Sequence, residues 1–248
     1  MSVLIFTVGQ NGYASTWRKC VLSQRRYAKK WGFEYIAVTR PLSVPEPALS
    51  AWLKVPLTLA ALRAGYEWVV FLDADCEISE SAPDFRDGLQ PDGAVFAAAG
   101  RTGRFNSGVI FTRNGAAAES FFGSLYSSVT DIISEEDRAR LKYENGNFIH
   151  IARKLNSVVT LDLGWNNSFD PDLDDNIRHY AGDMRKLYDR PMKDRILARI
   201  LRSFSVTPTI QPSSRDAAFK NRLEALTARV KLIYPQFAGG DILQDRTI

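Results

Sequence analysis

The chain has 248 residues, and its 32 Lys and Arg against 28 Asp and Glu give a formal net charge of +4. Hydrophobic residues make up 45% of it and charged residues 24%, which is typical of globular proteins and excludes a disordered, collagen-like or fibrous chain. So small an excess of positive charge does not indicate nucleic acid as a partner. The two cysteines, Cys20 and Cys76, are too few for a disulfide framework and fit a reducing compartment.

The N-terminal segment reads as the start of a folded domain. Its apolar run, residues 3–8, stops at Gly9 and lacks both a basic leader and a small-residue cleavage site, so it does not predict a signal peptide. No segment has the length and apolarity of a membrane span. We therefore expect a cytoplasmic protein.

The first hundred residues alternate between strand and helix patterns. Apolar runs rich in β-branched and aromatic residues predict strands at 3–8, 33–39, 68–72, 94–99 and 109–112. Helices are expected over about 15–31, with Ser15 as N-cap and Gly32 at the end, and over about 50–63. This alternation predicts an α/β fold with a mostly parallel central sheet flanked by helices. Ligands of such sheets bind beyond the carboxyl ends of the strands, which points to residues 9–14 and 73–75.

Asp73 and Asp75 directly follow the most clearly buried strand, residues 68–72. Two carboxylates at i and i+2, where a sheet ends, can approach one hard cation such as Mg²⁺ or Mn²⁺, which prefers oxygen ligands. The pattern alone is weak, because Asp-x-Asp recurs at 170–172 and at 172–174. Only the first copy follows five apolar residues. The alternative is a loop pair that caps the next helix.

His179 is one of two histidines, and it precedes Gly182, Arg185 and Lys186. An imidazole can complete a site made of two carboxylates, and a basic pair after a glycine can meet phosphate oxygens. The alternative is a surface histidine or a satisfied core histidine. His150, between two isoleucines on an expected helix, is interpreted as structural.

Three further polar segments are ambiguous by themselves. Residues 105–111 place Asn, Ser and Gly before a strand, which lets backbone and amide groups approach a polyhydroxylated ligand. Residues 165–167 read Trp-Asn-Asn, and residues 143–147 read Tyr-Glu-Asn-Gly-Asn.

Taken in chain order, these segments resemble the retaining, metal-dependent glycosyltransferases of the GT-A fold. Family 8 (glycogenin and LPS galactosyltransferase-like) and family 34 (galactosyl/xylosyltransferase-like) are the most similar in pattern. The resemblance runs from residue 3 to about residue 186. It rests on the strand and D-x-D of 69–75, the N-S-G of 106–108, the W-N of 165–166, and the H-x-x-G-x-x-R of 179–185. Residues 27–33 and the W-x-K of 52–54 resemble family 34 in particular.

The resemblance implies a Rossmann-like GT-A fold that transfers a sugar from a nucleotide-diphosphate donor, a UDP-sugar, to a glycan or glycolipid acceptor with retention. It implies Asp73, Asp75 and His179 as ligands of Mn²⁺ or Mg²⁺. The residues that it implies for donor binding are Thr7, Val8, Gly9, Tyr13, Lys54, Asp73, Ala74, Asn106, Ser107, Gly182, Arg185 and Lys186. Glu144 and Asn145 stand where the families usually have an acidic residue and Gln near the anomeric centre. The membrane anchor usual in eukaryotic members is not expected here, which favours a bacterial enzyme.

Two alternatives remain open. A phosphatase of the haloacid-dehalogenase type also places its nucleophile in a D-x-D after an apolar strand, and residues 172–175 could supply its later acidic motif. Its nucleophile usually follows the first strand, however, whereas Asp73 follows two earlier ones, and Cys76-Glu77 stand where Thr or Val is usual. The second alternative is a non-catalytic protein that binds a sugar nucleotide.

The character of the chain changes after residue 176. Residues 1–176 carry 18 basic and 21 acidic side chains, and residues 177–248 carry 14 and 7. We therefore expect a catalytic domain at 1–190 and a basic, helical extension at 191–248. Apolar residues at helical spacing predict two amphipathic helices in the extension, one with Met192, Ile196, Leu197, Ile200, Leu201 and Phe204 and one with Phe219, Leu223, Leu226 and Val230. Either both pack on the core, or one lies on an anionic membrane that presents a lipid-linked acceptor, with the protein peripheral at the inner face.

Overall fold

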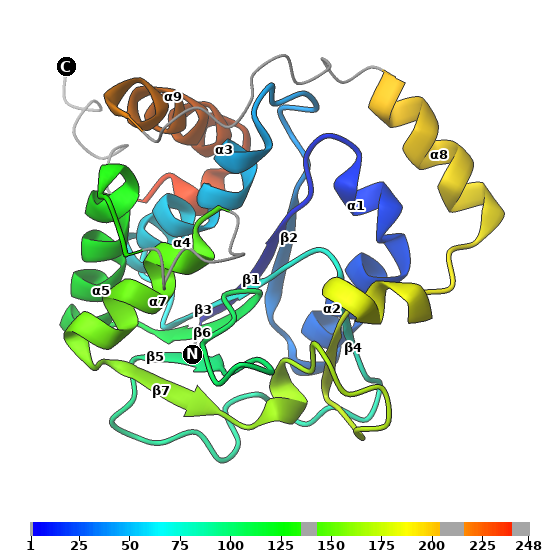
Figure 1. Cartoon of the computed structure of the whole chain (residues 1–248), viewed down its shortest axis with the longest axis horizontal. Helices are drawn as coiled ribbons and strands as arrows, with labels where there is room; N and C mark the ends of the chain where they lie inside the picture. Colours follow the sequence, from blue (N-terminus) through cyan, green and yellow to red (C-terminus); the bar gives the residue numbers. More distant parts are fainter. Residues whose placement is uncertain (1, 135–142, 204–215, 240–248) are drawn as a thin grey trace.

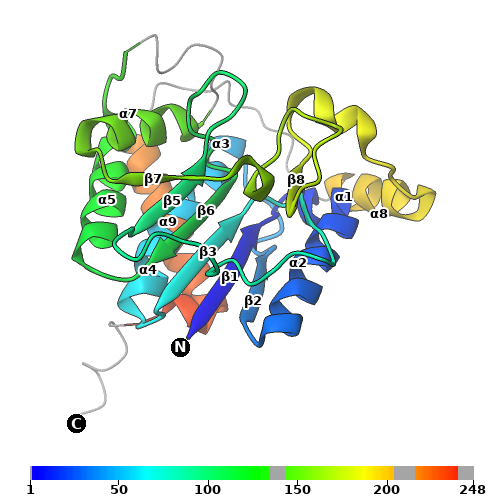
Figure 2. The ribbon, with the colours of Figure 1, turned by 90° about the horizontal axis from the view of Figure 1, so that it is seen from below.

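The structure is a computed structural model that describes residues 2–134, 143–203 and 216–239. A six-stranded sheet with the strand order β2-β1-β3-β6-β5-β7 forms its centre (Figures 1 and 2). The strands are β1 (Val3–Val8), β2 (Glu34–Val38), β3 (Trp68–Leu72), β5 (Val95–Ala98), β6 (Val109–Arg113) and β7 (Val158–Leu161). All run in the same direction except β6, which is antiparallel to both of its neighbours. The prediction of an α/β fold with a mostly parallel sheet is confirmed.

Both faces of the sheet are covered, which is why the inner strands β1, β3, β5 and β6 are continuous apolar runs rather than alternating ones. Along β1, Leu4 and Phe6 belong to the core on one face, whereas Val3 and Ile5 belong to the core on the other. On the first face lie α3 (Pro47–Trp52), α4 (Lys54–Arg63), α5 (Ala116–Ser127), α7 (Asn145–Leu155), α9 (Ala217–Ile233) and the short turns η1 (Ser128–Thr130) and η4 (Pro235–Phe237). The helix α2 (Arg18–Trp31) covers the opposite face (Figure 2).

The two helices expected near the N-terminus are each divided in two. The first consists of α1 (Tyr13–Thr16) and α2, which are separated at Trp17. It begins after Gly12, whose φ is 73°, so the prediction of Ser15 as N-cap is wrong. Trp17 leaves helical geometry and packs its ring against Tyr188, with the ring centroids 4.5 Å apart. The second helix is divided at Leu53 and begins earlier than expected, because Pro47 supplies a favourable first helical residue.

A small second sheet was not expected from the sequence. The strands β4 (Cys76–Ile78) and β8 (Ile177–His179) pair in antiparallel fashion, with Cys76 opposite His179. The turns η2 (Leu163–Trp165) and η3 (Gly182–Leu187) flank β8 in the chain. This pairing carries His179 to the end of β3, about a hundred residues away in the sequence.

The two C-terminal helices differ in how they pack. In α9 the side chains of Phe219, Leu223 and Val230 are fully buried in the same core cluster as β1 and β3. In α8 (Met192–Ser203), the side chains of Met192 and Ile196 are 68% and 55% exposed. Phe204 and the side chain of Leu201, predicted for the same apolar stripe, lie outside the described part of the chain. No helix among the described residues is both long and apolar enough to cross a bilayer.

Candidate active site

A cleft of about 660 Å³ opens where β1 and β3 end and the antiparallel β6 begins. Eleven residues singled out from the sequence line it: Val8, Tyr13, Lys54, Asp73, Asp75, Asn106, Ser107, Glu144, Asn145, His179 and Arg185. The sequence reasoning missed part of its rim, Pro47, Ser50 and Ala51 from α3. The proline-rich loop before that helix was the available signal.

Five other residues implied by the resemblance do not line the cleft. Thr7 and Ala74 are buried beneath it, and the hydroxyl of Thr7 has no hydrogen-bond partner among the described residues. A Cβ on Gly9 would lie 2.9 Å from the backbone nitrogen of Ala14, so this glycine permits a tight turn. Gly182 begins η3 with a φ of 49°, and the exposed Lys186 forms an ion pair with Asp183 at 2.7 Å.

A buried glutamine holds the turn that carries the two aspartates. Gln24, on α2, donates from Nε2 to the carbonyl oxygens of Asp73 at 3.0 Å and Cys76 at 2.8 Å. The hydroxyl of Tyr35 donates to the other end of the same amide at 3.0 Å. Gln24 was not among the site residues predicted from the sequence. Its position could have indicated this role, because Gln24 lies one turn from Cys20 and Tyr27 and is therefore a polar residue on the inner face of an amphipathic helix.

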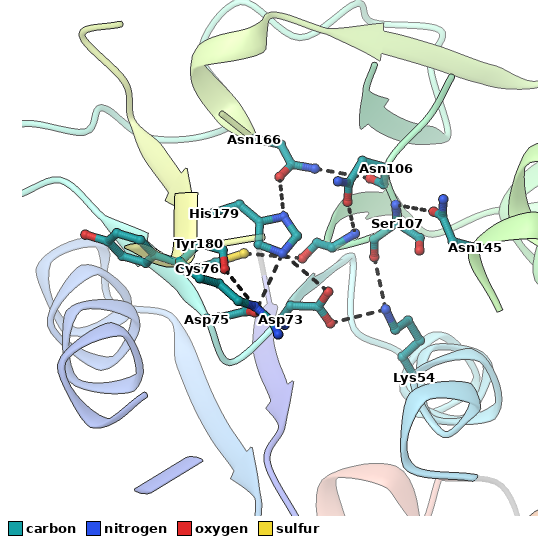
Figure 3. Close-up of polar contacts among 12 residues, drawn as sticks. Lys54, Asp73, Asp75, Cys76, Asn106, Ser107, Asn145, Asn166, His179 and Tyr180 are labelled. Atoms are coloured by element: carbon teal, nitrogen blue, oxygen red, sulfur yellow. Dashed lines mark hydrogen bonds and ion pairs between the residues drawn. The ribbon is translucent and has the colours of Figure 1, made fainter. Parts of the chain in front are cut away.

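Asn166 orients the ring of His179 (Figure 3). The amide nitrogen of Asn166 donates to the carbonyl oxygen of Asn106 at 3.1 Å, so its oxygen faces Nδ1 of His179, 3.0 Å away. A proton on Nδ1 satisfies this contact and leaves a lone pair on Nε2. Nε2 lies 3.4 Å from Oδ1 of Asp75 and 3.8 Å from Oδ2 of Asp73. The three predicted metal ligands therefore converge.

Gly108 allows this close approach. A Cβ at this position would collide with the ring of His179 and would lie 2.9 Å from Oδ2 of Asp73. The backbone nitrogen of Asp73 donates to the carbonyl oxygen of Gly108 at 2.7 Å, which holds the end of β3 against the start of β6. A glycine is therefore needed at position 108, because any larger side chain would occupy the space taken by His179 and Asp73.

Lys54 is buried, with 4% of its side chain exposed, and its ammonium group has three oxygen partners, of which Figure 3 shows those on Asp73 and Ser107. They are Oδ1 of Asp73 at 3.2 Å, Oε1 of Glu144 at 2.8 Å and the carbonyl oxygen of Ser107 at 3.2 Å. Burial alone would lower the pKa of Lys54, but the two carboxylates outweigh it and hold the pKa above its usual range. Lys54 is therefore a fixed positive charge in the wall of the cleft.

Glu144 and Asn145, at the start of α7, use their side chains differently. The Asn145 amide accepts from the backbone nitrogen of Ser107 at 2.8 Å and donates to the carbonyl oxygen of Phe105 at 3.3 Å, so both of its ends brace the turn before β6. Oε1 of Glu144 accepts from Lys54 and from the Ser107 hydroxyl at 3.0 Å. Its Oε2 has no hydrogen-bond partner among the described residues, and Glu144 lines the cleft.

The two aspartates differ in their electrostatic surroundings. Burial raises the pKa of Asp73 to about 6, although Lys54 opposes the shift. Burial would also raise the pKa of Asp75, but His179, the Tyr13 hydroxyl at 2.8 Å and Arg185 together lower it. The pKa of His179 lies above its usual value, because the attraction of Asp75 and Asp73 outweighs burial. The charges of Asp73, Asp75 and His179 therefore influence one another's pKa values.

These donors fit a hard divalent cation. Cys76 also lies within reach of Asp75 and His179, with ligand atoms of the three residues within 4.8 Å of one another. Burial raises the pKa of the Cys76 thiol well above its usual value, however, and its sulfur lies 3.7 Å from the carbonyl oxygen of Gly108. A protonated thiol is a poor metal ligand. The oxygens of Asp73 and Asp75 with Nε2 of His179 form the better set for Mg²⁺ or Mn²⁺.

The other Asp-x-Asp copies lie in a separate loop that they brace. Oδ2 of Asp175 accepts from Asn167 at 2.6 Å and from Arg178 at 2.9 Å, and Oδ1 of Asp170 accepts from the backbone nitrogen of Asp172 at 3.1 Å. None of these carboxylates lines the cleft. The acidic motif that a haloacid-dehalogenase-type phosphatase would need is therefore not in the cleft with Asp73.

Comparison with solved structures identifies the fold of the chain. No protein-family model and no curated protein matches the chain by sequence. Among solved structures, it is similar to a glycosyltransferase involved in the glycosylation of the major capsid of PBCV-1, with a TM-score of 0.59 and 16% identity over 80% of this chain and 100% of the other. The apo-form glycosyltransferase GlyE of Streptococcus pneumoniae TIGR4 matches with a TM-score of 0.51 and 12% identity, over 93% of this chain and 64% of GlyE. The galactosyltransferase LgtC matches with a TM-score of 0.49 and 14% identity, over 85% of this chain and 98% of LgtC. The chain has the GT-A glycosyltransferase fold.

Proposed function

We propose that the protein is a metal-dependent glycosyltransferase that moves a sugar from a nucleotide-diphosphate donor, a UDP-sugar, to a glycan or glycolipid acceptor, with retention at the anomeric carbon. The observation that carries the proposal is the convergence of Asp73, Asp75 and Nε2 of His179 in a cleft at the carboxyl end of β3. In α/β sheets this is where ligands bind. The volume of the cleft is in the range of small-molecule sites.

Asp73, Asp75 and His179 would hold the Mn²⁺ or Mg²⁺, which when bound neutralises charge on the leaving diphosphate. Asn166 and Gly108 keep the imidazole in place for this task. For the phosphate oxygens we favour Arg185 over Lys186, because Arg185 lines the cleft and Lys186 is paired outside it. The loop after β1, with Tyr13, is proposed to hold the nucleotide, and Asn106 and Ser107 to face the donor sugar or its ribose.

Glu144 is the residue that we propose to act at the anomeric centre. Lys54 and Ser107 fix one oxygen of its carboxylate, and the other oxygen has no partner among the described residues. As the bond to the phosphate breaks, positive charge develops on the sugar ring, and a preorganised carboxylate stabilises it. Asn145 would support the same centre from the turn that it braces.

Exposed apolar side chains on and just before α8 support the proposal that the protein contacts a membrane. Beside Met192 and Ile196, Leu187, Leu197 and Ile200 are also exposed, so five of the eleven exposed large hydrophobic side chains in the described part of the chain fall within residues 187–200. Arg195 and Arg199 are exposed on the same helix. Apolar side chains flanked by arginines suit an anionic bilayer surface. We therefore propose a cytoplasmic protein that is peripheral at the inner face of the membrane, with a catalytic domain at 1–190 and a basic extension at 191–248 that contributes α9 to the core.

Metal-dependent turnover of UDP-sugars tests the proposed activity. We expect Asp75→Asn to abolish release of UDP in the presence of Mn²⁺ while its thermal unfolding stays cooperative. Asp172→Asn, in a carboxylate pair away from the cleft, is the matched control and is expected to retain activity. Full turnover by Asp75→Asn in excess EDTA would contradict the metal assignment. Release of phosphate from an aryl phosphate would favour a phosphatase, and calorimetric binding of UDP-sugars without turnover would favour a non-catalytic binding protein.

Vesicle sedimentation tests the membrane proposal separately. We expect binding to vesicles that contain phosphatidylglycerol at low salt, and its loss in high salt or in the double variant Ile196→Asp/Leu197→Asp. Leu232→Asp, at an 88% exposed leucine of α9, is the control and is expected to bind normally. Equal binding by the double variant would contradict the assignment of α8, and a double variant that loses self-association instead would identify the α8 surface as a contact between copies of this chain.

A further inference from the structure

Each of the two proposed metal-binding carboxylates already has a cationic partner from the protein. The ammonium group of Lys54 lies 3.2 Å from Oδ1 of Asp73, and Nη2 of Arg185 lies 3.5 Å from Oδ2 of Asp75. Lys54 comes from the start of α4 and Arg185 from η3, so the two cations reach the carboxylates from different elements.

The charges that line the cleft are nearly balanced. Its charged side chains among the described residues are Lys54, Arg185, Asp73, Asp75 and Glu144. With His179 in the neutral form that metal binding requires, two positive charges stand against three negative ones. A divalent cation that entered alone would leave an excess of positive charge in a partly buried site, where charges interact more strongly than in water. A diphosphate brings several negative charges and removes this excess.

The two protein cations differ in their freedom to move. Lys54 is buried and held by three oxygen partners, so its position is fixed. The side chain of Arg185 is 57% exposed, and its polar contacts with the described residues are all long, at 3.5 Å to Asp75, 3.5 Å to the Tyr13 hydroxyl and 3.3 Å to the carbonyl oxygen of Tyr180. Its guanidinium also lies 6.0 Å from the centre of the Trp17 ring. Arg185 is therefore the cation that can change partners.

We propose that Arg185 couples metal binding to donor binding. In the protein without metal and donor, Arg185 pairs with Asp75 and disfavours a divalent cation there. When metal and donor bind together, Arg185 leaves Asp75 and pairs with the diphosphate. This inference rests on the proposed function and concerns the regulation of the same site. The metal therefore binds the protein weakly by itself and binds tightly together with the nucleotide. Because such coupling is reciprocal, UDP tightens metal binding by the same factor by which metal tightens UDP binding.

The coupling predicts opposite effects of one substitution on two affinities. Arg185→Gln removes the positive charge next to Asp75, so Mn²⁺ alone is expected to bind more tightly, by on the order of three- to tenfold at low ionic strength. The same variant loses its contact with the phosphates, so UDP in saturating Mn²⁺ is expected to bind more weakly. A residue that only stabilised the fold would lower both affinities.

The experiment measures Mn²⁺ binding by the electron paramagnetic resonance signal of free Mn²⁺, with and without UDP, in the full-length protein. Lys186→Gln is the control, because Lys186 follows Arg185 in the chain but pairs with Asp183 outside the cleft. Support requires that UDP strongly tightens Mn²⁺ binding in the wild type and in Lys186→Gln, and that this factor shrinks in Arg185→Gln through tighter binding of Mn²⁺ alone.

Three outcomes overturn the inference, and they are distinguishable. Mn²⁺ that binds the wild type equally well with and without UDP, or that binds Arg185→Gln no more tightly than the wild type when alone, overturns the coupling and leaves the proposed metal site intact. Failure of the wild type to bind Mn²⁺ even with UDP overturns the proposed function and the coupling together. Thermal unfolding of each variant, compared with the wild type, establishes that the protein measured is folded.

Discussion

The side-chain oxygen of Asn166 lies 3.0 Å from Nδ1 of His179, and the nitrogen of the same amide donates to the carbonyl oxygen of Asn106 at 3.1 Å. One buried amide thus links the turn before β6 to the imidazole that faces the carboxylates after β3. Partners of this kind fix the ring orientation and the tautomer of a metal-binding histidine. Asn166 is therefore a positioning residue for the proposed metal site.

Asn166→Ala is expected to weaken Mn²⁺ binding in the presence of UDP by about 10–100-fold, because the ring of His179 loses the partner of its Nδ1. Asn166→Asp keeps an acceptor for Nδ1 and is expected to recover part of the affinity. Electron paramagnetic resonance titration measures both variants, and their thermal unfolding reports on the fold. Wild-type affinity in Asn166→Ala would show that the packing of His179 is sufficient to orient it.

The positions of the carboxylates could be predicted from the sequence, but the position of the histidine could not. Asp73 and Asp75 follow five apolar residues, a local pattern that signals both a buried strand and its end. His179 is brought to them by the pairing of β4 with β8, each only three residues long. Strands so short have no periodicity to recognise. Only the resemblance to a family placed His179 in the site.

Gly108→Ala is expected to disrupt the cluster, because its Cβ would collide with the ring of His179 and press on the Asp73 carboxylate. Forced overpacking of this kind costs about 1–3 kcal/mol, and we expect a loss of Mn²⁺-dependent UDP binding as well. Gly123→Ala is the matched control, since a Cβ on that glycine in α5 meets nothing within 4 Å.

Urea unfolding and calorimetric titration with UDP and Mn²⁺ measure both effects. The control is expected to be neutral or stabilising by about 0.5–1 kcal/mol, because alanine favours a helix over glycine. If Gly108→Ala binds Mn²⁺ and UDP as the wild type does, the cluster tolerates a shift and the glycine is not required for it.

Gln24→Leu tests the support of the aspartate turn. Leucine has a similar size but cannot donate to the carbonyl oxygens of Asp73 and Cys76, which the glutamine now satisfies. Buried groups left without a partner cost about 1–3 kcal/mol. We therefore expect a lower urea midpoint together with weaker binding of Mn²⁺ and UDP. Gln90→Leu, at an exposed glutamine, is the control and is expected to stay within about 0.5 kcal/mol of the wild type. An unchanged urea midpoint in Gln24→Leu would show that other contacts hold the turn.

The strands β1, β3, β5 and β6 were predictable because they are buried and read as unbroken apolar runs. The edge strand β7 was not predicted, because it is only four residues long and half-exposed. The break of the first helix at Trp17 was not predictable, because it depends on packing between distant residues. Trp17 leaves the helix and packs against Tyr180 and Tyr188, which lie more than 160 positions further along the chain. The different packing of α8 and α9 could not be predicted either. Both helices have an amphipathic pattern in the sequence, and they differ only in the surface against which each one packs.

The helix α9 lies in the proposed extension but packs with the core of the sheet. Leu223 is fully buried in the core cluster that includes Phe6 and Trp52. Arg222 pairs with the buried Glu46 at 3.1 Å, and the Tyr234 hydroxyl accepts from the backbone nitrogen of Thr39 at 2.9 Å. The helix therefore also braces the segment that leads to α3 and the rim of the cleft.

Leu223→Ala is expected to cost about 2–5 kcal/mol of unfolding free energy, the range for a buried leucine in a close-packed core. Leu232→Ala, on the exposed side of the same helix, is the control and should stay within about 0.5 kcal/mol. Urea unfolding followed by both tryptophan fluorescence and far-UV circular dichroism should give one coincident transition, shifted in Leu223→Ala for both signals. A variant in which helix content falls while the tryptophan transition stays in place would show that α9 unfolds as part of an independent extension, since the core around Trp52 would then be stable without it.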